Sequence, residues 1–277
     1  MPPLLLFLLI CAPARGAEIK SPDSTIRWTI GAPVYSLLTP KGKTRERRLP
    51  PKPSEGNWTR RLLFPEKGAF FGVLDEKREE LGLHLEGRRG PATAKLAVSA
   101  SILYLLSKPG RVLWKKRLRE RHFGGAGTAD EIPLKITDDG TAAVLLQDSD
   151  PYTKSRPVVL VIDPRGRTKL ELGYTVWSRI DELSLSRDGR SLAIRGLGRI
   201  PEGENWGKAV GVYRIDDDKG WVSAVPEAEP SGRALRVHDE GWVCCVREGP
   251  VYVAFDPSGR RERMEPEEMI RRFGEGR

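Results

Sequence analysis

The sequence predicts an all-β protein built from repeated four-stranded antiparallel units. Two kinds of hairpin alternate along the chain: one has a polar turn ending in Asp-Gly or a variant of it, and the other has a turn that in most copies contains Pro and Gly. The runs between turns are rich in Val, Ile, Leu and Tyr, which suits half-buried strands. Each hairpin of the first kind is followed by one of the second. Four-stranded units repeated about an axis are the blades of a β-propeller.

Hairpins of the first kind place a polar turn before a short apolar strand. The clearest copies are 136–140 before 141–146 and 185–189 before 190–194. Asp-Gly supplies the positive φ values that tight hairpin turns require. All five turns of this kind lie at residues 19–24, 64–68, 136–140, 185–189 and 237–241.

Hairpins of the second kind join an apolar strand to a more charged one. Their turns lie at residues 40–42, 108–110, 164–166, 217–220 and 257–259. Pairing the two kinds predicts five blades at about 19–49, 62–118, 134–172, 183–225 and 235–264. In the second blade, 81–87 reads as an extra strand. An antiparallel sandwich with similar turns is the alternative fold.

A C-terminal helix and tail are expected at 265–277. Pro266 suits the first turn of a helix, and Glu267 and Glu268 follow it, where negative charge favours the helix N-terminus.

Residues 1–17 are predicted to be a signal peptide. Leu4–Cys11 is an unbroken apolar run, and small residues follow it. The run is too short for a membrane-spanning helix, which needs about 20 residues. We therefore expect a periplasmic or secreted protein. Lipid anchoring at Cys11 is a minor alternative, because Ile10 stands where a lipoprotein signal has a small residue.

Composition excludes several classes of protein. The chain has 277 residues, 39% of them hydrophobic and 31% charged, with 47 Lys and Arg against 38 Asp and Glu. These values exclude collagen, a coiled coil, a polytopic membrane protein and a wholly disordered chain. Three Cys and three His are too few for a disulfide scaffold or a multi-ligand metal site, so no metal or other cofactor is expected.

Several turns are similar to those of a known family. Ser21-Pro22-Asp23-Ser24, Ser186-Arg187-Asp188-Gly189 and Asp163-Pro164-Arg165-Gly166 resemble the Ser-Pro-Asp-Gly turns of WD40-like propeller repeats of the TolB type. The resemblance covers most of residues 19–264. It implies a rigid binding platform, exported in many bacteria, and no single activity.

The candidate site lies in the long connections between hairpins and between blades. These connections fall on the edge opposite the hairpin turns, and function concentrates on loops held by a rigid scaffold. Aromatic rings beside charged groups there could stack on a sugar or clasp a peptide. Alternatively, Trp177 and Trp206 fold back to fill gaps between blades. The candidate ligand-binding residues are Trp58, Arg121, His122, Asp148, Asp150, Tyr152, Trp177, Arg179, Asp181, Asn205 and Trp206.

No residue spacing forms a catalytic signature, so we expect an exported binding or scaffold module rather than an enzyme. Its expected ligand is a protein, peptide or glycan of the cell envelope. The alternative is a glycoside hydrolase-like enzyme with carboxylates from separate blades, Asp148, Asp150 and Asp181 first among them.

Two stretches, 41–48 and 115–121, are dense in Lys and Arg. They are either a solvated rim or a surface for anionic envelope polymers or lipid head groups. Nucleic acid is not expected as a partner of an exported chain.

Overall fold

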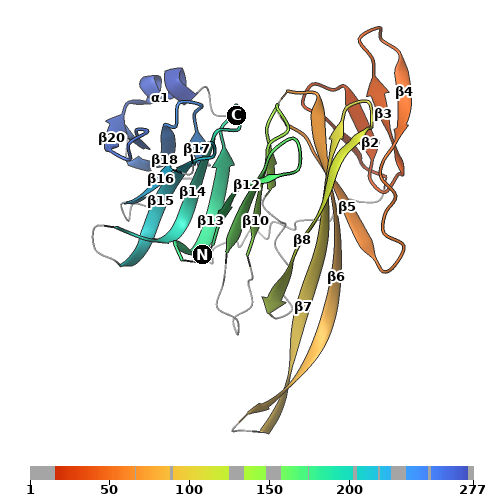
Figure 1. The fold of residues 1–277 in the computed structure, drawn as a ribbon, viewed down its shortest axis with the longest axis horizontal. Coiled ribbons are helices and arrows are strands. Elements are labelled where there is room, and N and C mark those ends of the chain that lie inside the picture. Colours follow the sequence, from red (N-terminus) through yellow and green to blue (C-terminus); the bar gives the residue numbers. More distant parts are fainter. Residues whose placement is uncertain are drawn as a thin grey trace, which may run out of the picture.

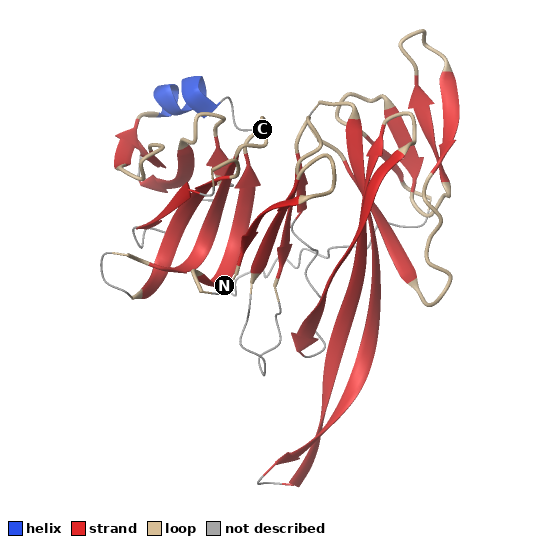
Figure 2. Cartoon of the chain, viewed as in Figure 1, coloured by secondary structure: helices blue, strands red, loops and turns tan. Residues whose placement is uncertain are grey.

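A computed structural model describes residues 16–65, 67–87, 90–124, 134–147, 157–173, 175–201, 205–217, 219–225, 235–248 and 251–273. These residues form five four-stranded antiparallel sheets, each made of four consecutive strands, and one short helix (Figures 1 and 2). The predicted fold class, a propeller of five four-stranded blades with a C-terminal helix, is confirmed. Most of the predicted signal peptide lies outside the described residues.

The blades are numbered 1 to 5 in chain order. Blade 1 contains β1 (Glu18–Lys20), β2 (Ile26–Thr29), β3 (Val34–Leu38) and β4 (Thr44–Arg48). Blade 2 contains β5 (Trp58–Leu63), β6 (Phe70–Gly87), β7 (Gly90–Ser107) and β8 (Val112–Gly124). Blade 3 contains β9 (Leu134–Ile136), β10 (Ala142–Leu146), β11 (Val158–Ile162) and β12 (Thr168–Leu172).

Blades 4 and 5 complete the chain. Blade 4 contains β13 (Trp177–Leu185), β14 (Ser191–Arg199), β15 (Trp206–Arg214) and β16 (Lys219–Ala224). Blade 5 contains β17 (Arg236–Val237), β18 (Val243–Glu248), β19 (Val251–Phe255) and β20 (Arg261–Met264), and helix α1 (Pro266–Phe273) follows.

Blade 2 is longer than the unit expected at 62–118. β6 and β7 have 18 residues each and are paired along their whole length, from Phe70 with Ser107 to Gly87 with Gly90. They therefore project beyond the other blades (Figure 1). Residues 81–87 therefore continue β6 and do not form the separate strand expected from the sequence. An unbroken ladder satisfies the backbone groups of both strands, which explains why no new strand begins there.

Consecutive blades pack face to face. Between blades 1 and 2, Trp28 packs with Phe71 in one buried cluster, and between blades 2 and 3, Leu103 packs with Val144 in another. Two further clusters join blade 3 to blade 4 and blade 4 to blade 5. Side chains alternate between the two faces of a strand, so an inner blade has to be apolar on both faces. The burial of β10, where all five residues are buried, follows from this requirement.

The two ends of the row of blades are finished differently. The outer face of blade 5 packs against α1 through Tyr252, Ala254 and Met269. The outer face of blade 1 is polar and exposed at Arg27 and Glu46, among others. Within the described part of the chain, none of the five clusters joins blade 1 to blade 5, and Figure 1 shows these blades at opposite ends. Charge at one end and a helix at the other therefore cover most of the apolar surface of the two end faces.

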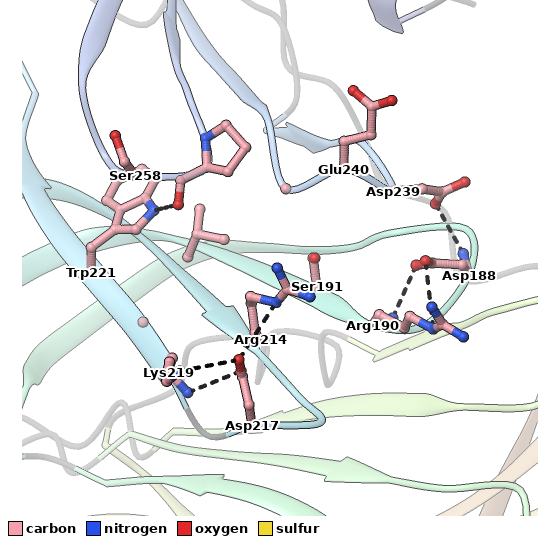
Figure 3. Close-up of a pocket in the computed structure, with 14 residues that line it drawn as sticks. Asp188, Arg190, Ser191, Arg214, Asp217, Lys219, Trp221, Asp239, Glu240 and Ser258 are labelled. Carbon is pink, nitrogen blue, oxygen red and sulfur yellow. Dashed lines mark hydrogen bonds and ion pairs between the residues drawn. The ribbon is translucent and has the colours of Figure 1, made fainter.

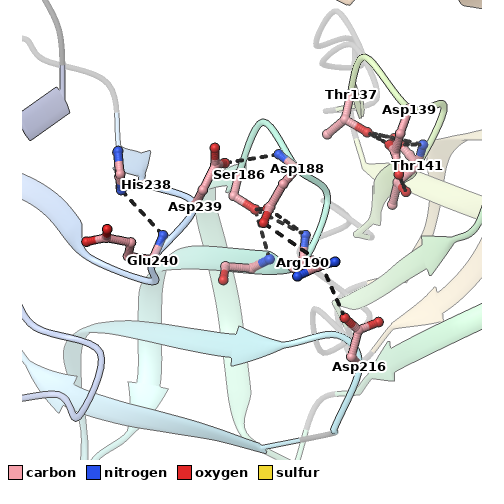
Figure 4. Close-up of polar contacts among 11 residues, drawn as sticks. Thr137, Asp139, Thr141, Ser186, Asp188, Arg190, Asp216, His238, Asp239 and Glu240 are labelled. Atoms are coloured by element: carbon pink, nitrogen blue, oxygen red, sulfur yellow. Dashed lines mark hydrogen bonds and ion pairs between the residues drawn. The ribbon is translucent and has the colours of Figure 1, made fainter.

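The polar turns are held by a recurring hydroxyl–carboxylate bond. In blade 4 the Ser186 hydroxyl donates to Asp188 over 2.6 Å and accepts the amide of Ser191 over 2.9 Å (Figure 4). Ser21 and Asp23 repeat the arrangement in blade 1 at 2.7 Å. Asp in these turns therefore serves the turn, as its position in the sequence predicts.

No described helix is both long and apolar enough to cross a membrane.

Candidate functional site

The described residues predicted for the loop-edge site belong to blades 2 and 4. Asp148, Asp150 and Tyr152 lie outside the described residues, and His122 is on β8. Trp58 begins β5, where its indole Nε1 donates to the carbonyl of Glu55 over 2.6 Å. Its polar atom is therefore engaged within its own loop.

Arg121 is a structural residue. Its side chain is 3% exposed and pairs with the Glu76 carboxylate at 3.1 Å. Burial opposes ionisation of Glu76. The hydrogen bond from Ser99 and the charges of Arg78 and Arg121 outweigh burial, so the pKa of Glu76 lies below its usual value. The cluster stabilises the root of the long β6–β7 hairpin.

The two candidate tryptophans of blade 4 have opposite roles. Trp177 is fully buried, and its Nε1 donates to the Tyr213 hydroxyl over 2.8 Å, so Trp177 fills the blade interface as the alternative interpretation predicted. Trp206 is 48% exposed at the start of β15. Asn205, which precedes it, is also exposed.

Exposed groups do gather at the loop edge of blade 4. Arg179 and Asp181 form a surface ion pair at 2.7 Å on β13. A hollow of about 550 Å³ opens on this edge, lined by Thr175, Val176, Arg199, Pro201 and Val222. Arg199 is the register partner of Trp206. This edge retains four predicted residues: Arg179, Asp181, Asn205 and Trp206.

A cleft of about 480 Å³ lies between blades 4 and 5 at the opposite edge, where the hairpin turns are (Figure 3). It forms where four turns and strand ends converge. Its lining residues are Asp188, Arg190, Ser191, Val212, Arg214, Asp217, Lys219, Gly220, Trp221, Asp239, Glu240, Gly241, Pro257 and Ser258.

The two walls of the cleft differ in charge. Blade 4 supplies the three cations, Arg190, Arg214 and Lys219, together with the carboxylates Asp188 and Asp217. Blade 5 supplies only carboxylates among its lining residues, Asp239 and Glu240. A ligand that carries both charges can therefore face an opposite charge on each side.

Trp221 closes one end of the cleft. Its ring packs against Phe255 with centroids 5.5 Å apart, and its Nε1 donates to the Pro257 carbonyl over 3.1 Å. These contacts fix the indole, so it offers a rigid apolar surface beside the charged walls.

The ion pairs in the cleft are long. Arg214 and Lys219 lie 3.9 Å and 4.0 Å from Asp217, and Arg190 lies 3.8 Å from Asp216. The buried Arg60–Asp75 pair, in contrast, measures 2.6 Å. Contacts near 4 Å are beyond hydrogen-bond distance, so these cations keep donors for a ligand.

A bond between two turns fixes the mouth of the cleft. The amide of Asp188 donates to the Asp239 carboxylate over 3.0 Å (Figure 4). The Asp188 carboxylate is itself used by its own turn, through Ser186 and the amide of Arg190. Sequence reasoning treated turn residues as structural and missed the cleft, because nothing in either turn signals that two blades bring them together.

Two features of the described residues bear on metal and acid–base chemistry. These residues contain no group of three or more His, Cys, Asp or Glu that could hold a metal ion. The carboxyls whose pKa is displaced are all displaced downwards, so they stay ionised and are unsuited to donating a proton. These carboxyls are Asp23, Glu76, Asp163 and Asp256.

Comparison with known proteins gives similarity of structure only. No family model matches the chain, and no curated protein does. Among solved structures, the β-propeller domain of the Trilobed protease from Pyrococcus furiosus is 12% identical with a TM-score of 0.38, over 74% of this chain and 57% of that one. Virginiamycin B lyase from Staphylococcus aureus is 11% identical with a TM-score of 0.37, over 90% and 68%. The Dos1 propeller is 10% identical with a TM-score of 0.37, over 90% and 69%.

The chain's own sheets place it in a class of proteins. Five consecutive four-stranded antiparallel blades define a β-propeller protein. A fold of this kind hosts many unrelated functions, so the function of this chain depends on the residues of its cleft and its edges.

Proposed function

We propose that this protein is a binding module whose cleft between blades 4 and 5 holds an extended polypeptide segment carrying both charges. The observation that supports this most strongly is the difference between the two walls beside the fixed ring of Trp221. The blade 4 wall holds three cations and two carboxylates, and the blade 5 wall holds carboxylates as its only charged lining residues. A polypeptide has charged side chains of both signs and a backbone that can bond to both walls. It therefore fits the cleft better than a ligand of one charge.

Peptide binding can be tested with three synthetic probes of equal length. One alternates Lys and Glu with Gly between them, one carries only Lys and one carries only Glu. Fluorescence anisotropy is expected to show that the mixed-charge peptide binds most tightly. Arg214→Ala combined with Glu240→Ala should weaken its binding by about tenfold or more, since one charge is lost from each wall.

The matched control removes a pair of the same charges from the loop edge. Arg179→Ala with Asp181→Ala should leave peptide binding unchanged. Equal losses in both double variants, or no preference for the mixed-charge peptide, would contradict the proposal. Loss of binding in Trp206→Ala alone would move the site to the loop edge predicted from the sequence.

We also propose that the protein acts outside the cytoplasm, on a partner in the cell envelope. The apolar run Leu4–Cys11 and the small residues after it support this location. N-terminal sequencing of the protein after expression in its host should give a chain beginning near Ala17. A chain that keeps residues 1–16 and stays in the cytoplasm would contradict it.

The hydrolase alternative has less support than binding. It relies on Asp148, Asp150 and Asp181, and the one of these that the structure describes, Asp181, pairs with Arg179. Retaining and inverting glycosidases need two carboxyls about 5–10 Å apart around a pocket. The described residues supply only Asp181 of the three candidates for such a pair.

A further inference from the structure

The net charge of the chain is concentrated in two neighbouring hairpins, here called the basic hairpins, residues 41–48 and 108–117. They hold ten of the 47 Lys and Arg and one of the 38 Asp and Glu. The remaining 37 of each sign cancel, so the basic hairpins account for the whole net charge of +9.

The basic hairpins lie side by side. The Tyr35 hydroxyl of blade 1 donates to the Lys108 carbonyl of blade 2 over 2.6 Å. A Cβ built at Gly110 would lie 3.6 Å from the Cβ of Arg47, so the aliphatic part of Arg47 rests on the turn of blade 2. Figure 1 shows β3–β4 and the β7–β8 turn at the same edge of the molecule.

Most of these cations face solvent. Lys41, Lys43, Arg45 and Arg111 are exposed. Lys108 pairs with Asp23, and Lys116 donates to Thr168 over 2.5 Å, so those two are used inside the protein. The exposed cations therefore give this surface an excess of positive charge, which attracts a polyanion and weakens with salt.

Exposed aliphatic side chains accompany the charge. The large hydrophobic side chains that are exposed in the described part of the chain are Leu38, Val112, Leu113, Trp206 and Ile270. Leu38 ends β3 and Val112 begins β8, so three of these five belong to the basic hairpins or adjoin them. Basic residues beside exposed aliphatic groups suit the surface of an anionic bilayer, where head groups meet acyl chains. A nucleic acid offers no layer into which Leu113 could insert.

We propose that the basic hairpins dock the protein on an anionic lipid surface. Cations of blades 1 and 2 bind the head groups, and Leu38, Val112 and Leu113 enter the boundary with the acyl chains. The surface lies on different blades from the cleft between blades 4 and 5, so docking and ligand binding are independent properties.

The test compares sedimentation with vesicles of phosphatidylcholine alone and with vesicles containing about one third phosphatidylglycerol. The docking variant carries Lys41→Glu, Lys43→Glu, Arg45→Glu and Arg111→Glu. The control variant carries Arg179→Glu, Lys208→Glu, Lys219→Glu and Arg260→Glu, four exposed cations of blades 4 and 5. Both variants lower the net charge from +9 by the same amount, and all three proteins share residues 1–15, so any effect of that segment cancels.

The wild type should prefer anionic vesicles, and the preference should shrink as salt rises. The docking variant should lose about a hundredfold or more in affinity, because each cation near the surface contributes a factor of about five. The control variant should stay within about threefold of the wild type, because its cations lie away from the surface. Equal losses in both variants, or no preference for anionic vesicles, would overturn the proposal.

A second variant tests the same surface if the four charge-reversing substitutions of the docking variant disturb folding. Leu38→Ser with Leu113→Ser retains every charge and should lower binding to anionic vesicles at high salt by about tenfold, since less apolar surface is buried. No change in that variant would overturn the insertion of aliphatic groups. Tighter binding of the wild type to a short DNA duplex than to anionic vesicles at the same salt would replace the lipid surface with a nucleic acid.

Discussion

Gly166, in the β11–β12 turn of blade 3, lies directly against the indole of Trp114 on β8 of blade 2. A Cβ at position 166 would come within 2.9 Å of the Cβ and Cγ of Trp114. The same contact recurs between blades 5 and 4, where a Cβ at Gly259 would lie 2.8 Å from the ring of Trp221. Glycine in the second kind of turn thus serves the packing between blades as well as the turn itself.

Gly166→Ala should lower the free energy of unfolding by about 2–4 kcal/mol. The backbone there has φ of +82°, which disfavours a side chain, and the added methyl would also clash with Trp114. Gly42→Ala is the matched control, with φ of +72° and no atom within 4 Å of a Cβ, and should lose only about 1–2 kcal/mol. Urea unfolding measures both. Equal losses would show that the contact with Trp114 contributes nothing.

Tyr213→Phe should destabilise the protein by about 1–3 kcal/mol, because it leaves the buried Nε1 of Trp177 without its acceptor. Tyr35→Phe removes a hydroxyl that donates to the Lys108 carbonyl, and Lys108 is only half-buried, so water can replace that donor. Tyr35→Phe should therefore lower the free energy of unfolding by about 1 kcal/mol or less. Thermal unfolding of the two variants compares them, and a larger loss in Tyr35→Phe would contradict this account.

Stability should fall as the pH rises from 10 to 12. Burial raises the pKa of the Tyr213 hydroxyl from 10.0 to about 12, so the folded protein keeps this proton after the unfolded chain has lost it. The contribution of Tyr213 to the free energy of unfolding is complete below pH 10. It falls by roughly 2 kcal/mol between pH 10 and pH 12. Tyr213→Phe should show a shallower decline in urea-derived stability over the same range. Parallel declines would show that other groups cause it.

Asp75→Ala should cost about 3–5 kcal/mol. Asp75 is fully buried and accepts two bonds of 2.6 Å from Arg60, whose side chain is 3% exposed, so the substitution leaves a buried cation without its partner. Asp181→Ala breaks a pair exposed on both sides and should change stability by less than about 0.5 kcal/mol. Chemical denaturation of both variants is the measurement. Replacing Arg60 and Asp75 together by Met and Leu should recover much of the loss.

Helix α1 offers two adjacent residues with opposite environments. Met269 is 2% exposed against blade 5, and Ile270 is 41% exposed. Met269→Ala should lower stability by about 2–5 kcal/mol, whereas Ile270→Ala should have little effect. Hydrogen exchange of the β19 amides reports whether the helix protects blade 5. Unchanged exchange in Met269→Ala would mean that α1 is not needed to cover that face.

Much of the fold was predictable because its signals are local. Asp139-Gly140 and Pro164-Arg165-Gly166 each define a turn within a few residues, and the apolar runs around them define strands. The candidate site was less predictable. Trp177 and Trp206 both begin strands at the loop edge, yet Trp177 is buried and Trp206 is exposed. The indole of Trp177 bonds to Tyr213, which is 36 residues away in the sequence.

The sequence by itself determined the alternation of hairpins, the five blades and the C-terminal helix, because turn geometry and strand periodicity depend on neighbouring residues. Tertiary structure alone decided where charge and aromatic surface meet. Asp188 and Asp239 are 51 residues apart, and only the packing of blade 5 on blade 4 brings them together at the mouth of a cleft. The same holds for the basic hairpins: the sequence shows two charged stretches, and the packing of blade 2 on blade 1 makes them one surface.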